Sequence, residues 1–400
     1  MYDYKKILEE LKQGSSKKES ASNIGAIIRG ARIERKMTQG EVAKGICSVS
    51  YLSKIENGLY DLKNAYVQEI MHRMDVKVDR HHTMDHTGIV NDVLMAVYHR
   101  DLVKLQSMRL RFEKPVVPAE WLVELAHHVL LKEEDKAAIT FLNQNRRVLG
   151  KDELYLFLLL LAMHELQAYR IRDVAKLLDF LEMAQEDAPA YSVMSHFVLG
   201  RYYLLNGQYA PASHALSTAL GLHGSVMRDA WRVDIMNHLL LVFVFGNEMP
   251  SAEQIVKQLV QLPSGSEWEE YAMGYYYMKK KEFDKALKSF LQAKELHFAP
   301  SMLGIVECCY LAGWHEKMRD YYHILDEVAP GTFFEKMANM FLLVIGPNLV
   351  PLKDYVTHIL QPQFQLFGFY YYKQMAIRYL QEYFRSISRY KQVDLLRLEK

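Results

Sequence analysis

Cysteine, proline and long apolar runs are all scarce in this chain. The 400 residues include only three cysteines, two of them adjacent, and no CxxC spacing. This composition argues against a disulfide-stapled fold and a cysteine-based zinc site, and it favours a reducing compartment. The longest apolar run, residues 154–163, is about half as long as the roughly 20 residues that a membrane helix needs. Because the beginning, MYDYKKILEELK, has no apolar signal region, we expect a cytoplasmic protein without a membrane partner.

Motifs that carry catalysis are also missing. The sequence contains no GxSxG, no phosphate-cradling P-loop and no HExxH. A histidine-rich stretch at residues 75–87 offers His82 and His86 at helical spacing, which is compatible either with a metal site or with a solvated linker. Since no further ligand pattern accompanies it, we expect no enzyme, no metal and no cofactor.

Net charge is nearly absent, but charge is unevenly distributed. The formal net charge is +1, which by itself says nothing about partners. Between Lys17 and Lys54, however, the chain contains eight Lys and Arg residues and three Glu residues, which gives a local net charge of 8 − 3 = +5. A unit that engages the phosphates of a nucleic acid needs such an excess.

The stretch 38–58, TQGEVAKGICSVSYLSKIENG, reads as two short helices joined by a tight turn. Thr38 can cap the first helix, and Glu41 three residues later completes a capping box. Ser48 can cap the second helix, which Gly58 ends because glycine tolerates a left-handed backbone. A helix, a turn and a second helix with a polar outer face fit the DNA major groove.

The flanking sequence extends this unit in both directions. Asn23 can cap a first helix, and residues 64–74 read as a fourth. Before them, residues 2–12 can form a short amphipathic helix, and residues 14–22 read as a flexible basic linker, either a disordered tail or an arm along DNA. The predicted domains are a helix and linker (1–22), a helix-turn-helix domain (23–74), a linker (75–87) and a helical repeat domain (88–400).

DNA contacts are expected from the outer face of the second helix and from residues near it. Polar and methyl-bearing side chains there can read base edges, an amide at a helix N-terminus can hold a phosphate, and basic side chains can add backbone contacts. The alternative is that the module mediates only protein contacts. The candidates are Ser48, Val49, Ser50, Tyr51 and Lys54 for the second helix, Gln39 for the phosphate, and Arg35 and Lys36 for the backbone.

Beyond residue 88 the sequence reads as helical repeats with a period of roughly 34. The spacing small–aromatic–small–large–small occurs twice, and the two copies begin at Gly200 and Gly274, which are 274 − 200 = 74 residues apart. A weaker copy lies between them. We therefore predict an all-α protein in which the helix-turn-helix domain precedes a tetratricopeptide-repeat (TPR) α-solenoid of about eight helical pairs. The matching residues are Gly200, Tyr203, Ala212, Leu216 and Ala219, and Gly274, Tyr277, Ala286, Phe290 and Ala293.

These motifs resemble a known family. Thr38-Gln39, Glu41, Ala43, Ser53-Lys54-Ile55-Glu56 and Gly58 match the helix-turn-helix of the phage-repressor (XRE) kind. The form ICSVSYLSKIENG, followed by TPR-like repeats, resembles the peptide-pheromone-sensing regulators of the PlcR and NprR kind, the RRNPP group. The resemblance implies a transcription regulator whose TPR domain binds a short, re-imported signalling peptide. We expect a homodimer that reads a palindromic operator in double-stranded DNA, because two small helix-turn-helix domains together bind DNA more tightly than one.

Aligning the TPR pattern on this chain predicts a concave wall that is apolar and aromatic, with isolated polar groups, as a short hydrophobic peptide requires. Asn237 is expected to pair with the peptide backbone, since its amide both donates and accepts, although it can equally bond a neighbouring repeat. Arg201 suits a carboxylate. Two alternatives remain: a module that sequesters or dephosphorylates a response-regulator partner, and a repressor without a ligand. The predicted wall residues are Phe197, Arg201, Leu204, Asn237, Leu241, Trp268, Tyr271 and Tyr275.

Overall fold

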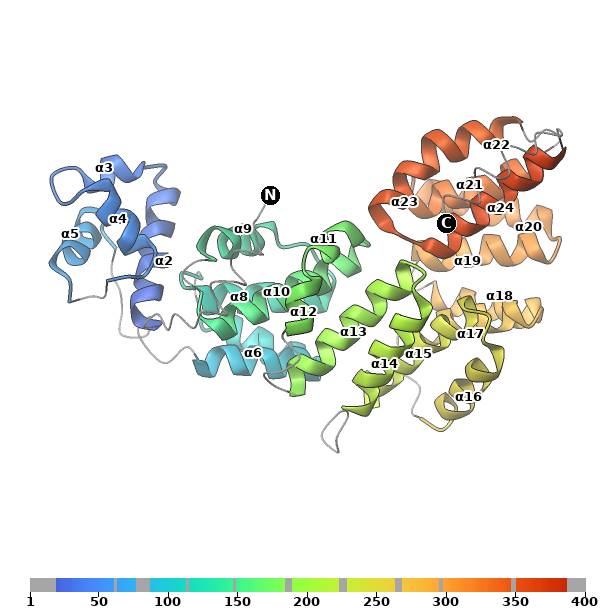
Figure 1. The fold of residues 1–400 in the computed structure, drawn as a ribbon, viewed down its shortest axis with the longest axis horizontal. Coiled ribbons are helices and arrows are strands. Elements are labelled where there is room, and N and C mark those ends of the chain that lie inside the picture. The colour runs from blue at the N-terminus through green and yellow to red at the C-terminus, as the bar shows by residue number, and fades with distance from the viewer. Residues whose placement is uncertain are drawn as a thin grey trace. The chain divides into compact units, whose positions relative to one another are not determined.

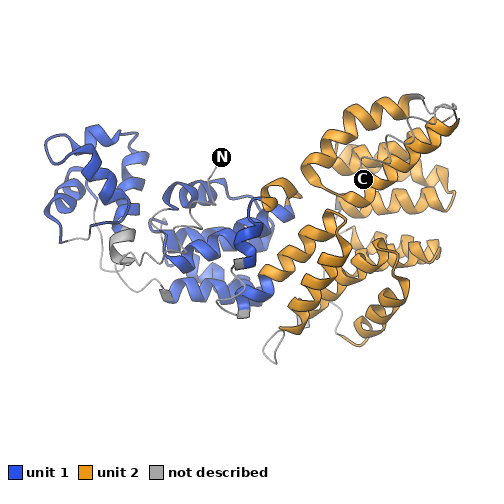
Figure 2. Ribbon diagram, viewed as in Figure 1, with its two compact units in different colours: residues 1–167, 176–194 blue, residues 168–175, 195–400 orange. Residues whose placement is uncertain are grey.

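The computed structural model contains only helices, turns and loops in the part of the chain that it describes (Figure 1). It therefore confirms the all-α prediction. Two compact units emerge, unit 1 with residues 1–167 and 176–194, and unit 2 with residues 168–175 and 195–400 (Figure 2). None of the described helices is long and apolar enough to cross a membrane. The described residues are 19–60, 63–76, 87–112, 115–146, 149–183, 189–222, 229–262, 268–294, 298–346 and 350–386.

The four N-terminal helices of unit 1 form a small domain with the predicted local signals. Thr38 caps α3 through the expected capping box with Glu41, and Ser48 accepts a hydrogen bond from the backbone N–H of Tyr51 at the start of α4. Gly58 adopts a φ of 73°, which explains why glycine follows the last turn of α4. The helices are α2 (Glu19–Glu34), α3 (Gln39–Ala43), α4 (Val49–Glu56) and α5 (Ala65–Arg73).

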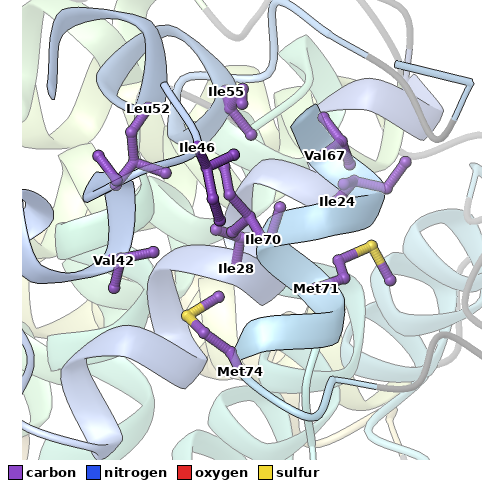
Figure 3. Packing of buried hydrophobic residues seen from close by; sticks show 11 residues of the cluster. Ile24, Ile28, Val42, Ile46, Leu52, Ile55, Val67, Ile70, Met71 and Met74 are labelled. Carbon is purple, nitrogen blue, oxygen red and sulfur yellow. The ribbon is translucent and has the colours of Figure 1, made fainter. Parts of the chain in front are cut away.

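One apolar core joins these four helices. Every helix contributes fully buried aliphatic side chains, and the close-up in Figure 3 shows them converging between α2, α4 and α5. The packing of α2 on α4 is tight, because a Cβ at Gly25 would lie 2.7 Å from the backbone oxygen of Ile55. The core therefore fixes the orientation of α4, the helix expected to meet DNA.

The start of α2 differs from the prediction. We expected the helix to begin at Asn23 after a linker over 14–22, yet it begins at Glu19. Small and polar residues at 20–23 have modest helix propensity, but a helix already anchored by its buried face extends over them at little cost. Residues 1–18 and the histidines of the 75–87 stretch lie outside the described residues.

Further helices of unit 1 follow the expected pairing. Short turns separate α6 from α7 and α8 from α9, and α10 is buried along most of its length. They are α6 (Thr87–His99), α7 (Leu102–Arg109), α8 (Pro118–Leu131), α9 (Lys136–Asn145), α10 (Lys151–Gln167) and α12 (Leu178–Met183).

Unit 2 contains the predicted repeats, and the small residues of the pattern lie where two helices approach each other closely. A Cβ at Gly200 would lie 2.4 Å from Leu216, so the first helix of that pair approaches the second at the glycine. Phe290 lies between two glycines, since a Cβ at Gly274 would be 2.6 Å and one at Gly304 2.7 Å from its ring. Fully buried large side chains beside glycines are how neighbouring helical pairs interlock.

The helices of unit 2 pack with their sequence neighbours, as in a solenoid. After the repeats the chain turns back, and α24 contacts α21, α22 and α23. The elements are α11 (Ile171–Ala175), α13 (Pro189–Leu205), of which residues 195–205 belong to unit 2, α14 (Tyr209–Gly221), α15 (Asp229–Phe245), α16 (Met249–Leu259), α17 (Glu269–Lys279), α18 (Phe283–Ala293), α19 (Phe298–Leu311), α20 (His315–Val328), α21 (Phe333–Val344), α22 (Val350–Tyr355), the π-helical segment η3 (Val356–Leu360), α23 (Gln361–Phe367) and α24 (Tyr370–Ser386).

Candidate DNA-binding surface and ligand groove

The outer face of α4 is exposed, as the prediction that it reads DNA requires. Val49 keeps 49% of its surface accessible, and Ser50 and Lys54 are also exposed, while Leu52 and Ile55 on the opposite face are fully buried. Ser50 and Lys54 are four residues apart and therefore share one face. This face offers a hydroxyl, an ammonium and an apolar group to a base edge.

Two residues predicted for DNA contact also have structural partners. The hydroxyl of Ser48 caps α4, at 3.1 Å from the backbone nitrogen of Tyr51. The half-buried ring of Tyr51 stacks on Tyr60 at 4.6 Å and meets the edge of Tyr66 at 5.0 Å. The amide of Asn64 donates to the Tyr51 hydroxyl at 3.0 Å. These contacts brace α4 against the segment that follows it.

A buried carboxylate connects α2, α3 and α4. Glu56 is only 2% exposed, and it accepts hydrogen bonds from Arg32 Nε at 2.6 Å and from Arg32 Nη2 at 3.1 Å. Gln39, which we expected to hold a phosphate, donates from Nε2 to Glu56 at 2.8 Å. The second N–H of the same amide is still available for a phosphate, so the bond to Glu56 orients Gln39 at the N-terminus of α3.

Basic side chains lie just beyond α2. Arg35 and Lys36 are exposed, and Lys36 adopts a left-handed φ of 55° that turns the chain toward α3. With Lys54 they give this domain cations that DNA phosphates can meet. Their contact with DNA remains a prediction.

Unit 2 contains a groove lined mainly by aromatic and aliphatic side chains, which we call the ligand groove. Five of the eight predicted wall residues line it, namely Arg201, Leu204, Leu241, Trp268 and Tyr271. The remaining cavity is only about 50 Å³, room for a few water molecules. The other lining residues are Tyr169, Leu205, His238, Phe245, Phe369, Tyr370, Tyr371 and Tyr372.

Arg201 is held between two aromatic rings. Its guanidinium carbon lies 5.7 Å from the centroid of Phe197 and 5.4 Å from that of Trp268. His238 meets the edges of the same two rings, at 5.0 and 5.2 Å, and its Nδ1 is 2.8 Å from the carbonyl oxygen of Asp234. Cation–π contacts of this kind hold a guanidinium in a fixed orientation.

A match to a known family decides the nature of the N-terminal domain. A family described as "Helix-turn-helix" matches residues 28–80. Residues 28–80 are a helix-turn-helix domain. The pattern over 38–58 that predicted it is confirmed, including both caps.

Two solved structures are similar to a large part of the chain. One is "Bacillus thuringiensis PlcR in complex with the peptide PapR7 and DNA", with 17% identity, 69% of this chain and 97% of that chain covered, and a TM-score of 0.29. The other is "Streptococcus dysgalactiae SHP pheromone receptor Rgg2", with 11% identity, 76% and 99% covered, and a TM-score of 0.24. No curated protein matches the sequence.

Three predicted wall residues do not line the ligand groove. Phe197 is 5% exposed and supports Arg201 from behind, and Tyr275 is buried and hydrogen-bonds Tyr372. Asn237 is fully buried, and neither its Nδ2 nor its Oδ1 has a hydrogen-bond partner among the described residues. Of the two α15 residues predicted for the wall, Leu241 lines the groove and Asn237 does not; His238 and Phe245 line it beside Leu241.

The repeat pattern also missed the residues that close the groove. Tyr169 precedes α11, and Phe369 to Tyr372 lie at the start of α24, far along the chain from the repeats that they face. The aromatic run FGFYYY was the available signal, but a local repeat pattern says nothing about where a later segment packs.

One cluster in unit 1 brings together groups able to bind a metal. A ligand atom from each of Glu124, His128 and Asp135 lies within 4.8 Å of the others. Arg109 Nε is 2.7 Å from Glu124 Oε2, and Asp135 caps α9. Glu124 Oε2 is therefore engaged in an ion pair, and Oδ1 of Asp135 in a helix cap.

Proposed function

We propose that the protein is a homodimeric transcription regulator whose helix-turn-helix domains bind a palindromic operator, and that a short signalling peptide in the ligand groove alters that binding. The observation that carries the proposal is the exposed face of α4, with Val49, Ser50 and Lys54, on a domain with a local excess of positive charge. A helix held by a core on one side and polar on the other enters a major groove.

Support for a peptide comes from the chemistry of the groove. Its walls are aromatic and aliphatic, as apolar peptide side chains require, and Arg201 supplies one oriented cation for a carboxylate. The sequence resemblance to peptide-sensing regulators points to the same class of ligand. A regulator of this kind needs both a sequence-reading surface and a separate ligand site, and the chain offers both.

The proposal is tested with the full chain. Operators are selected from a random DNA library, and peptides that co-purify with the protein are identified by mass spectrometry. Footprints are then compared with and without these peptides, and light scattering reports whether the chain is a dimer. Footprints that the peptides leave unchanged would contradict the ligand-dependent part of the proposal, and the absence of any selected operator would contradict all of it.

Lys54→Ala should reduce discrimination between the selected operator and random DNA by about tenfold, corresponding to the roughly 1–3 kcal/mol of one base contact. Lys54 lies on the face of α4 that enters the groove, so its loss removes sequence reading. Lys44→Ala is the matched control, because Lys44 is equally exposed but follows α3. Fluorescence anisotropy against both DNAs is the measurement. An equal loss on operator and random DNA would reassign Lys54 to a phosphate.

Asn237→Ala should weaken binding of the co-purified peptide by about tenfold while leaving the melting temperature unchanged or higher. Both polar atoms of this amide are buried without a partner among the described residues, which costs roughly 1–3 kcal/mol. Asn237 does not line the closed groove, so we propose that a ligand reaches this amide once the groove opens, and alanine then removes both the cost and the contact. Calorimetry of peptide binding and thermal unfolding of the same samples give the two values. A lower melting temperature with unchanged peptide affinity would make Asn237 a structural residue.

A further inference from the structure

The chain enters α24 through an unusual backbone conformation. Gly368 has a φ of 70°, and the next residue, Phe369, has a φ of 54°. Glycine accepts a left-handed conformation freely, but a bulky aromatic residue adopts it only when surrounding contacts compensate its cost. The residues that follow, Phe369 to Tyr372, are named here the aromatic segment.

Contacts of the aromatic segment compensate this cost. The ring of Phe369 stacks on Phe333 at 4.6 Å, and that of Tyr371 stacks on Phe245 at 4.5 Å. Tyr372 shares a short hydrogen bond with Tyr275. Phe245 lies on α15, Tyr275 on α17 and Phe333 on α21, so the segment contacts three helices of unit 2.

Tyr370 completes the attachment by lying directly on a glycine. A Cβ at Gly207 would be only 2.0 Å from Cδ1 of Tyr370. No side chain at position 207 can coexist with this placement of the ring. The turn between α13 and α14 therefore fits the segment closely.

The aromatic segment occupies space that the sequence predicted for a ligand. All four of its residues line the ligand groove, opposite Arg201, Leu241 and Trp268. The remaining 50 Å³ is far below the roughly 300–1,000 Å³ typical of a small-molecule site. A peptide of even a few residues does not fit until the segment moves.

One buried group makes the closed arrangement costly to maintain. Glu307 is fully buried, and its Oε1 accepts a hydrogen bond from the Tyr371 hydroxyl. Its Oε2 has no hydrogen-bond partner within the described ranges. The unpartnered Oε2 and the left-handed phenylalanine make the closed arrangement costly, whereas the aromatic stacking and the hydrogen bond from Tyr371 to Glu307 hold the segment in place.

We propose that the aromatic segment is an internal occupant of the ligand groove and that a ligand binds only by displacing it. The inference rests on the proposed function for the identity of the groove as the ligand site. The ligand must then replace the ring that stacks on Phe245, which selects peptides that carry aromatic side chains. The affinity of such a peptide is reduced by the fraction of protein in which the groove is closed.

The test uses the full chain and a synthetic peptide that copies residues 367–374, FGFYYYKQ, with lysines added for solubility. Gly207→Ala forces Tyr370 away without altering any lining residue of the groove, so the free peptide should bind this variant about tenfold more tightly than the original chain. Gly313→Ala is the matched control. Gly313 also has a positive φ, 75°, but a Cβ there would meet nothing within 4 Å. Binding is followed by fluorescence anisotropy against a scrambled peptide.

A second pair of variants makes the result independent of backbone strain at position 207. Tyr371→Ala should also increase peptide binding, whereas Tyr379→Ala, on the same helix but packed against Tyr310 and Phe341, should not. Equal affinity of the original chain and of both opened variants would overturn the proposal, as would equal binding of the scrambled peptide. If the opened variants bind the peptide but operator footprints do not respond, the internal occupant stands and the proposed regulation fails.

Discussion

Arg32→Ala should destabilise the helix-turn-helix domain by about 3–5 kcal/mol, because it leaves a buried carboxylate without its main partner. Glu56 is 2% exposed, and Arg32 donates two of the hydrogen bonds that it accepts. The same guanidinium also donates to the carbonyl oxygen of Met37 at 3.0 Å, so α2, the turn before α3 and the end of α4 loosen together. Hydrogen exchange of residues 42–56, followed by mass spectrometry, measures the loss.

The matched control for this variant is Arg35→Ala. Arg35 is exposed, and its guanidinium donates to the carbonyl oxygen of Ala31 on its own helix. Its replacement should leave hydrogen exchange of residues 42–56 nearly unchanged while weakening DNA binding through the lost charge. Equal protection of these amides in both variants would show that the ion pair of Arg32 with Glu56 does not hold the domain together.

Glu307→Gln should stabilise unit 2 above pH 7 and have no effect near pH 4. Burial raises the pKa of Glu307 from 4.5 to about 7, although the Tyr371 hydroxyl and the charge of Lys279 oppose the rise. Because the folded chain binds this proton more tightly than the unfolded chain, the stability contributed by the carboxyl is complete below pH 4.5 and is lost as the pH rises through 7. Glutamine keeps the neutral form at every pH, so the gain should reach about 3 kcal/mol.

The charged groups around Glu307 come from two helices. Lys279 on α17 and Arg378 on α24 are cationic, and Tyr371 and Tyr372 on α24 supply hydroxyls. Thermal unfolding of the original chain and of Glu307→Gln between pH 4 and 8 measures the difference. Glu382→Gln, an exposed position on α24, is the control and should show no trend. A pH-independent difference for Glu307→Gln would mean that the pKa of this carboxyl is the same in the folded and the unfolded chain.

Local chemistry made much of the fold predictable. The capping box of Thr38 with Glu41 and the cap at Ser48 are signals carried by neighbouring residues, and both occur as expected. The glycines at 200 and 274 lie against Leu216 and Phe290, as the repeat pattern implies. In each case the residues that decide the structure are close in sequence or follow a fixed spacing.

Other features depend on contacts that no local pattern contains. The repeat pattern predicted Asn237 and Leu241 for the wall of the groove, and Leu241 lines it together with His238 and Phe245, whereas Asn237 does not. The aromatic segment, which closes the groove, lies far along the chain from the residues that it contacts. Tyr372, for example, hydrogen-bonds Tyr275, which precedes it by 97 residues. Such returns of the chain are set by tertiary packing alone.

The position of Phe290 between two glycines has a consequence for how this chain can vary. A methyl group added at Gly274 or at Gly304 would lie 2.6–2.7 Å from the ring of Phe290. Neither glycine can therefore be replaced by alanine while the phenylalanine ring is in place. Alanine at one glycine thus becomes acceptable only after a smaller residue replaces Phe290, and that replacement makes alanine at the other glycine acceptable too. The three positions form one epistatic unit, in which the order of substitutions decides whether an intermediate sequence folds.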